Sequence, residues 1–285
     1  MPAVVSQKDR QSAVMSAFIT EVHALKPGNV SRYADGHDMT VAEFERSAGL
    51  VSPVLCDTSL TVGERILESV RLTMSEVGCN TNLGMLLLFA PVIRAAETAA
   101  DSAPESLQQV LEKALRELDV DEAKRFFEAI RVAAPGGLGH SEEYDVHLDP
   151  ACSVLEAMET ARERDLIAKQ YVTGFSDIFS TGLPCIKEFN KRWNRVEWAT
   201  VGCYLTFLSS FPDSHVLRKH GQTVAHRTRK RAQSVAEVFK KNDKPDNARQ
   251  ALLEFDKELK NSGINPGTSA DLTAASVLVY ELTKG

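Results

Sequence analysis

The feature that most constrains this chain is a succession of helix-start signals, each followed by apolar residues at helical spacing. Thr40 and Thr61 each precede a glutamate by three residues. In this capping-box pattern the hydroxyl and the carboxylate satisfy backbone groups that are free at a helix start. Strand signals are nearly absent, with no convincing run of alternating β-branched residues. The chain has no Asn-Gly pair, and its single Asp-Gly pair, Asp35-Gly36, does not lie between two such runs as a hairpin turn would. The sequence therefore predicts an all-α protein.

Apolar periodicity extends the helical pattern along the whole chain. Besides the helices after Thr40 and Thr61, we expect helices at about residues 8–24, 81–99, 105–117, 121–133, 152–170, 196–211, 215–241, 245–261 and 269–283. The clearest break is the Gly-rich stretch at residues 134–140. Because the helices on both sides of it look amphipathic and need one another, we interpret it as a loop within one helical domain over residues 1–285.

Composition and charge exclude several classes of protein. The net charge of −6 gives no overall attraction for nucleic acid or anionic lipid. Five scattered cysteines without a CxxC pair argue against a disulfide framework and a structural zinc site. Residues 1–10 lack the apolar core of a secretory signal, and the longest apolar stretch, residues 83–93, is too short to span a bilayer. We therefore predict a cytoplasmic protein that binds neither nucleic acid nor membrane.

Four polar segments lie at the ends of expected helices, where free N–H groups and the helix dipole attract anions. In the first, residues 21–39, Lys26 and Arg32 can hold phosphate. Glu21 and Asp38 of the same segment can hold a metal ion or act as bases. Taken alone, the segment is better explained as a helix end followed by a solvated loop, because loops are usually polar.

The second segment, residues 76–84, places polar side chains between an amphipathic helix and a very apolar one. If the apolar helix is central, Asn80, Thr81 and Asn82 are drawn towards the core and must find partners. Those partners are either a ligand or other groups of the protein, and the sequence leaves both open.

The third segment, residues 211–221, puts cations in the first turns of a helix that Asp213 or Ser214 can cap. A cation there opposes the helix dipole, so His215, Arg218 and Lys219 make sense if an anion lies between them. The alternative is an exposed basic helix, since basic residues continue beyond this segment.

The fourth segment, residues 265–272, combines a Pro-Gly turn with another capping-box-like pattern at a helix start. Thr268 and Asp271 form a capping-box-like pair, and the turn can deliver backbone N–H groups to an anion. Plain helix capping is the alternative interpretation.

Motifs in these segments resemble, in the same order, those of the triphosphoribosyl-dephospho-CoA synthases. The matching stretches are Glu21 with Lys26-Pro27-Gly28, Gly36-His37-Asp38-Met39 with Phe44 and Ser47, Gly78-Cys79-Asn80-Thr81, Asp213-Ser214 with Lys219 and Gly221, and Pro266-Gly267 with Ser269-Ala270-Asp271-Leu272. The resemblance implies an all-helical transferase of cofactor biosynthesis. Such an enzyme moves the triphosphoribosyl group of ATP to a hydroxyl of dephospho-CoA, or of a similar phosphorylated acceptor, and releases adenine.

Two departures from the family pattern concern groups that contact phosphate. Asn82-Leu83-Gly84 stands where the family has His-Lys-Gly, and Lys219-His220-Gly221 stands where it has Arg-Gly-Gly. A related transferase of a one-carbon cofactor pathway, one that uses tetrahydromethanopterin or methanofuran, is therefore an alternative. A non-catalytic nucleotide-binding protein is another.

The resemblance also implies roles for particular residues in displacing adenine through an oxocarbenium-like transition state. The expected catalytic carboxylates are Glu21, Asp38 and Asp271, and Mg²⁺ is expected on Asp38 and Asp213. The expected substrate-binding residues are Lys26, Arg32, His37, Asn80, Thr81, Asn82, His215, Arg218, Lys219 and Ser269. His140 and Glu142 or Glu143 can also line the site, and a homodimer is compatible with the sequence. All of this requires the four segments to meet in one cavity for a polyphosphate.

Overall fold

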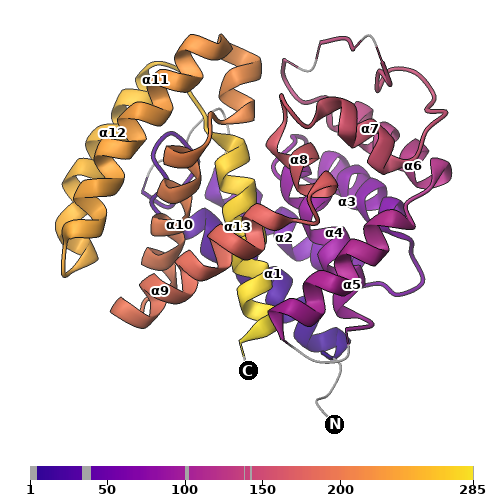
Figure 1. Ribbon diagram of the computed structural model, residues 1–285, viewed down its shortest axis with the longest axis horizontal. Helices are drawn as coiled ribbons and strands as arrows, with labels where there is room; N and C mark the ends of the chain where they lie inside the picture. The colour runs from indigo at the N-terminus through magenta and orange to yellow at the C-terminus, as the bar shows by residue number, and fades with distance from the viewer. Residues whose placement is uncertain (1–4, 34–39, 100–102, 138, 142, 285) are drawn as a thin grey trace.

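The computed structural model describes residues 5–33, 40–99, 103–137, 139–141 and 143–284, and these form helices and turns without a β-strand (Figure 1). The prediction of an all-α protein is confirmed. The elements are α1 (Gln7–His23), α2 (Val41–Leu55), α3 (Val62–Glu76), α4 (Leu83–Ala96), α5 (Pro104–Arg116), α6 (Val120–Ala133), α7 (Val154–Ala161), α8 (Leu166–Val172), the π-helical turn η1 (Ile178–Gly182), α9 (Leu183–Trp193), α10 (Val196–Ser210), α11 (Ser214–Lys241), the 3₁₀ turn η2 (Pro245–Ala248), α12 (Arg249–Asn261) and α13 (Gly267–Thr283).

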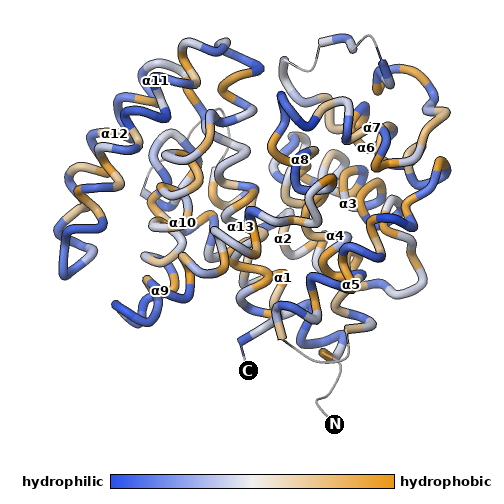
Figure 2. Tube along the Cα trace, viewed as in Figure 1, coloured by the Kyte–Doolittle hydropathy of each residue, from blue (hydrophilic) through white to orange (hydrophobic). Residues whose placement is uncertain are grey.

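The core is organised around α4 and α13, which pack against each other. Of the 14 residues of α4, 12 are buried, and 12 of the 17 residues of α13 are buried. Helices α1, α9 and α10 also pack on α13, whereas α3 and α5 pack on α4 (Figure 1). Hydrophilic residues gather at the outward ends of α9 and of the α11–α12 pair (Figure 2). Because α4 and α13 are packed by other helices on several sides, the starts of these two helices are held in fixed positions.

The two capping boxes predicted from sequence are present. The hydroxyls of Thr40 and Thr61 accept hydrogen bonds from the N–H groups of Glu43 and Glu64, whose carboxylates accept from the threonine N–H groups in return. The apolar residues that follow the caps, such as Val51 and Ile66, are buried. Local helix signals thus placed α2 and α3 correctly.

The helix prediction was wrong at one place and incomplete at another. The expected helix at residues 152–170 is two helices, α7 and α8, because Asp165 leaves the helical conformation and caps α8 through the N–H groups of Ile167 and Ala168. The segment containing η1 and α9 was not predicted at all. Its glycine at 182 is required by packing, since a Cβ there would lie 1.9 Å from Ser276 Oγ of α13.

Helix α11 changes direction near its start. Gly221 has φ +81° and ψ 171°, which breaks the helix between the cation-bearing first turns and the long basic segment behind them. The left-handed φ suits glycine because it has no Cβ. Separately, none of the described helices is long and apolar enough to cross a membrane.

Candidate active site

A cavity of about 630 Å³ lies where α4, α8, α11 and α13 begin, with α6, α7 and the loop between them on the remaining side. Its apolar wall includes Leu87, Phe127 and Met158. Its polar and charged lining residues include Asn29, Asn80, Thr81, Asn82, His140, Ser141, Asp145, Arg164, Asp165, His215, Arg218, Asn265, Thr268 and Asp271. Helix starts present free N–H groups and a positive dipole end, so this arrangement favours an anionic ligand. The volume is that of an ordinary small-molecule site.

The four polar segments meet at this cavity. Asn29 of the first segment donates to Asn265 of the fourth at 2.9 Å. Asp213 of the third accepts from Ser269 of the fourth at 2.7 Å from the backbone N–H. The Gly84 end of the second segment lies against the carboxylate of Asp271. Residues that are far apart in sequence thus come together around the start of α13.

Asp271 is the central acidic group of the cavity. It lies in the second turn of α13, is half-buried, and makes no hydrogen bond or ion pair with any residue that the structure describes. Burial raises the pKa of its carboxyl well above the ordinary value, and the nearby carboxylates of Glu21, Asp213 and Asp165 raise it further. The guanidinium of Arg218 acts in the opposite direction. A raised pKa makes the ionised carboxylate a stronger proton acceptor than an ordinary aspartate.

The predicted cap formed by Thr268 and Asp271 was wrong. Helix α13 begins at Gly267 with Pro266 as the residue before it, and no side chain in the described part of the chain caps this end. Asp271 is therefore too far along the helix to cap it, and its carboxylate instead faces the cavity.

Gly84 provides the space that Asp271 needs. A Cβ at position 84 would lie 2.1 Å from Asp271 Oδ2 and 2.9 Å from Oδ1. Any larger residue in this first turn of α4 would therefore displace the carboxylate. Gly84 is the glycine that the chain shares with the family's His-Lys-Gly pattern.

Glu21 and Lys26 lie behind the cavity wall. Lys26 Nζ is 3.0 Å from Glu21 Oε1, and both side chains are almost completely buried. Lys26 also donates to the carbonyl of Val30 at 2.8 Å. Burial raises the pKa of Glu21 and lowers that of Lys26, and each partner opposes the shift of the other. Glu21 thus reaches the cavity through its electrostatic effect on Asp271, and neither residue lines it.

Asp213 is buried and its carboxylate oxygens are occupied by hydrogen bonds. Oδ1 accepts from the N–H groups of His215 and Val216 at 2.9 and 3.1 Å, which confirms the predicted cap of α11. Oδ2 accepts from the N–H and the hydroxyl of Ser269 at 2.7 and 2.8 Å. Asp213 and Ser269 therefore tie the start of α11 to the start of α13 and do not line the cavity.

The amides of the second segment have different surroundings. Asn80 Oδ1 accepts from the N–H of Leu83 at 3.1 Å, and Thr81 Oγ1 is 3.0 Å from Ser47 Oγ. The Nδ2 of Asn82 is buried and donates to no acceptor among the described residues. All three residues line the cavity, although the unused donor of Asn82 is itself buried beside it.

Of the cations predicted in α11, two line the cavity. His215 lies beside Gly267, and Arg218 NH1 is 3.7 Å from Asp165 Oδ2. Lys219 packs against Gly136 and is not among the lining residues. Of the three predicted cations, Arg218 therefore brings a guanidinium to the cavity. Its Nε donates to the carbonyl of Gly136 at 3.2 Å.

The remaining predicted residues lie elsewhere. Arg32 forms an ion pair with Glu197 at 2.6 Å on the outside of α10. His37, Asp38 and Glu142 lie outside the described residues. His140 lines the cavity as expected, whereas Glu143 is exposed away from it.

Sequence reasoning missed Asp165 and Arg164 of the cavity. The signal was an aspartate directly before the apolar Leu166, but the stretch was interpreted as the middle of a continuous helix. Recognising Asp165 as a cap would have divided the helix and placed both residues at an exposed end.

Comparison with known proteins decides the family. A sequence model of the ATP:dephospho-CoA triphosphoribosyl transferase family matches residues 7–285. The chain belongs to this family. No curated protein matches the chain. The fold is similar to a crystal structure of an Archaeoglobus fulgidus protein assigned as a triphosphoribosyl-dephospho-CoA synthase, with a TM-score of 0.64 and 24% identity over 84% of this chain and 98% of that one.

The family match confirms three predictions. The chain is an enzyme, it is a transferase of the triphosphoribosyl-dephospho-CoA synthase type, and ATP is a substrate of its family. The comparisons favour neither the one-carbon cofactor transferase nor the non-catalytic nucleotide-binding protein.

Proposed function

We propose that the cavity around Asp271 binds ATP and dephospho-CoA, and that Asp271 is the base for triphosphoribosyl transfer. The reaction forms a bond between an acceptor hydroxyl oxygen and C1′ of the ATP ribose while the bond from C1′ to N9 of adenine breaks. Asp271 takes the hydroxyl proton, and adenine leaves with the electron pair of the broken bond and takes up a proton from solvent. Asp271 returns its own proton to solvent, so the step balances. The observation that carries the proposal is a carboxylate that has a raised pKa and no hydrogen-bond or ion-pair partner among the described residues, in a cavity lined by helix starts.

The phosphates have a matching surface on the same cavity. The positive dipole ends of α4, α11 and α13 lie at the cavity, although several of their first N–H groups already donate to Asp213 and Asn80. Arg218 supplies a guanidinium for a charge-assisted hydrogen bond. Leu83 lines the cavity where the family pattern has lysine, so Arg218 carries more of the charge here.

Mg²⁺ fits the acidic side of the cavity. Asp165 and Asp271 both line it, but Oδ1 of Asp165 already accepts from the N–H groups of Ile167 and Ala168, and its Oδ2 is 3.7 Å from Arg218 NH1. Asp271 has no such contacts among the described residues, and as the proposed base it would keep one oxygen for the hydroxyl proton and offer the other to the ion. Carboxylates with an excess of negative charge suit a hard divalent cation, which would neutralise phosphate charge when bound. Asp213 is a poorer ligand than we expected from sequence because its oxygens are already engaged.

The activity is tested by measuring adenine release with ATP, Mg²⁺ and dephospho-CoA. We expect adenine to appear in step with acceptor consumption, and none to appear without acceptor. Release of AMP or phosphate in place of adenine, or no acceptor-dependent product, contradicts the proposal.

The phosphate site is tested by Arg218→Gln with Arg231→Gln as the control. Both residues lie on α11, but Arg231 pairs with Glu258 at 2.9 Å away from the cavity. A hydrogen bond to a charged group contributes about 1.5–3 kcal/mol, so Arg218→Gln should raise the KM for ATP roughly 10–100-fold. An equal effect of the control would remove Arg218 from the site.

The proposed substrates also bear on where the protein works. An enzyme that consumes ATP and a CoA precursor, with a net charge of −6, fits a cytoplasmic protein that binds neither nucleic acid nor membrane. A homodimer stays a prediction, which light scattering of the purified protein tests directly.

A further inference from the structure

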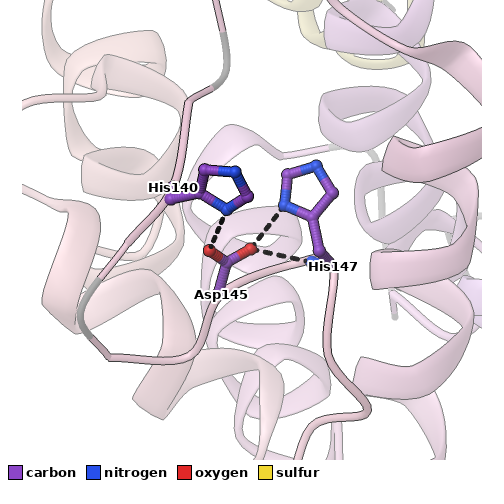
Figure 3. Close-up of side chains that lie close together, drawn as sticks. All are labelled: His140, Asp145 and His147. Carbon is purple, nitrogen blue, oxygen red and sulfur yellow. Dashed lines mark hydrogen bonds and ion pairs between the residues drawn. The ribbon is translucent and has the colours of Figure 1, made fainter.

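Two histidines and an aspartate converge in the loop between α6 and α7 (Figure 3). His140 Nδ1 is 3.1 Å from Asp145 Oδ2, and His147 Nδ1 is 2.6 Å from Asp145 Oδ1. The centroids of the two imidazole rings are 4.9 Å apart, so the rings lie side by side over one carboxylate. One ligand atom from each residue lies within 4.8 Å of the others.

The carboxylate of this cluster is fixed before any ligand arrives. The N–H of Ser141 donates to Oδ2 of Asp145 at 3.0 Å, and the N–H of His147 donates to Oδ1 at 2.9 Å. These backbone bonds come first among the causes that hold the pKa of Asp145 well below its ordinary value. The side chain is only 10% exposed, whereas those of His140 and His147 are 84% and 47% exposed. A rigid carboxylate therefore stands beside two accessible imidazoles.

We propose that His140, Asp145 and His147 bind a divalent first-row transition metal ion, such as Zn²⁺ or Co²⁺. Two imidazole nitrogens and one carboxylate oxygen suit these ions, whereas Mg²⁺ prefers oxygen ligands alone. The hydrogen bonds from the N–H groups of Ser141 and His147 orient the Asp145 carboxylate, as groups behind the ligands do in known metal sites. This site does not depend on the proposed triphosphoribosyl transfer.

The position of the cluster gives the ion a place near the substrate. His140 and Asp145 line the same cavity as Asp271. Three protein ligands leave coordination positions for water or for a further donor. The ion would thus lie at the rim of the cavity, where a phosphate oxygen of a bound molecule can reach a vacant position. The chemical class of its additional ligand is therefore an oxyanion.

The simpler role of the cluster is a hydrogen-bonded clasp that closes the loop. In that role the two imidazoles share Asp145 and bind no ion. The two roles differ in one measurable respect, because a clasp gives no metal affinity that depends on both histidines.

The test is metal binding by the full chain without an affinity tag, after removal of metal with a chelator. Co²⁺ is added and its visible absorption is followed, and Zn²⁺ is then measured by competition with a chromophoric chelator. We expect one ion per chain. Replacing even an orienting group usually lowers metal affinity about 10–100-fold, so His140→Ala, His147→Ala and Asp145→Asn should each lose at least that much.

The matched control is His23→Ala. His23 is a surface histidine that also contacts a carboxylate, with its Nε2 at 2.7 Å from Glu45 Oε1, but no second histidine completes a cluster around it in the described part of the chain. We expect this variant to bind Co²⁺ as the unchanged protein does, and excess Mg²⁺ to leave the Co²⁺ spectrum intact. Equal binding by the control and the three cluster variants would overturn the proposal. So would a thiolate-to-cobalt band, which would place the ion on cysteine.

Discussion

Asp213 and Asp271 are two aspartates beside the start of α13 that have opposite surroundings. Asp213 accepts hydrogen bonds from three backbone N–H groups and one hydroxyl, and it links α11 to α13. Asp271 has no hydrogen-bond or ion-pair partner among the described residues and faces a cavity. Burial raises the pKa of both carboxyls, but the hydrogen bonds of Asp213 counteract the effect whereas the neighbouring carboxylates of Asp271 increase it.

The difference separates a structural carboxylate from a functional one. A buried polar group without a partner costs free energy, and folded proteins keep few of them. Asp213 avoids this cost within the protein. Asp271 is only half-buried and makes no such bonds within the described part of the protein, so its carboxylate is open to the cavity, to water, a proton, a metal ion or a substrate. The same contrast explains why Asp271 is the residue that we assign to chemistry.

The largest expected effect is on turnover in Asp271→Asn. Loss of a positioned base usually lowers the rate about 10²–10⁴-fold, and we expect a fall in kcat of that order for adenine release. Asp243→Asn is the control, because Asp243 is fully exposed beside Arg192. Turnover within a few-fold of the unchanged enzyme would show that Asp271 is not the base.

The second effect concerns the stability of Asp213→Ala. This change removes a helix cap and leaves buried N–H groups of α11 and α13 without an acceptor. We expect the free energy of unfolding to fall by about 2–4 kcal/mol. Denaturant titration measures it, with Ser269→Ala as a milder variant that removes the hydroxyl alone. If Asp213→Ala is as stable as the starting protein, the distinction between the two aspartates fails.

The third effect tests the space around Asp271 without changing it. In Gly84→Ala the new Cβ would displace the Asp271 carboxylate, and a shift of about 1 Å at a reacting group can cost about 10²-fold in rate. Gly49→Ala is the matched control, because the nearest atom to a Cβ there is Met15 Cε at 4.0 Å. We expect the control to keep its activity. Equal kcat values for both variants would argue that the position of Asp271 does not matter.

Sequence predicted which segments form the site better than which side chains face it. Helix ends carry recognisable signals, so the four segments could be found and their meeting expected. The direction of a side chain depends on where the helix begins and what packs behind it. Asp271 was expected to cap α13, but the helix begins at Gly267 and turns Asp271 towards the cavity. Lys26 was expected to contact phosphate, but it pairs with Glu21 in the interior.

The place of Asp165 in the cavity could not be predicted from the sequence for a related reason. Apolar periodicity continues through residues 152–170 closely enough to suggest one helix, and the break becomes visible only when α7 and α8 pack separately. Tertiary contacts thus decided what the local pattern left open.

The most direct test of the central claim is the unfolding free energy of Asp271→Asn relative to the unchanged protein as a function of pH. An unfolded aspartate titrates near pH ~4, and the folded-state pKa of Asp271 lies well above that. As pH rises between the two pKa values, the unfolded chain loses its proton first, so the unchanged protein loses stability. Asparagine has no such penalty. We therefore predict that Asp271→Asn gains relative stability as pH rises above ~4 and keeps that advantage at neutral pH. A variant that is less stable than the unchanged protein at neutral pH would show that Asp271 has a stabilising partner, and would contradict the account.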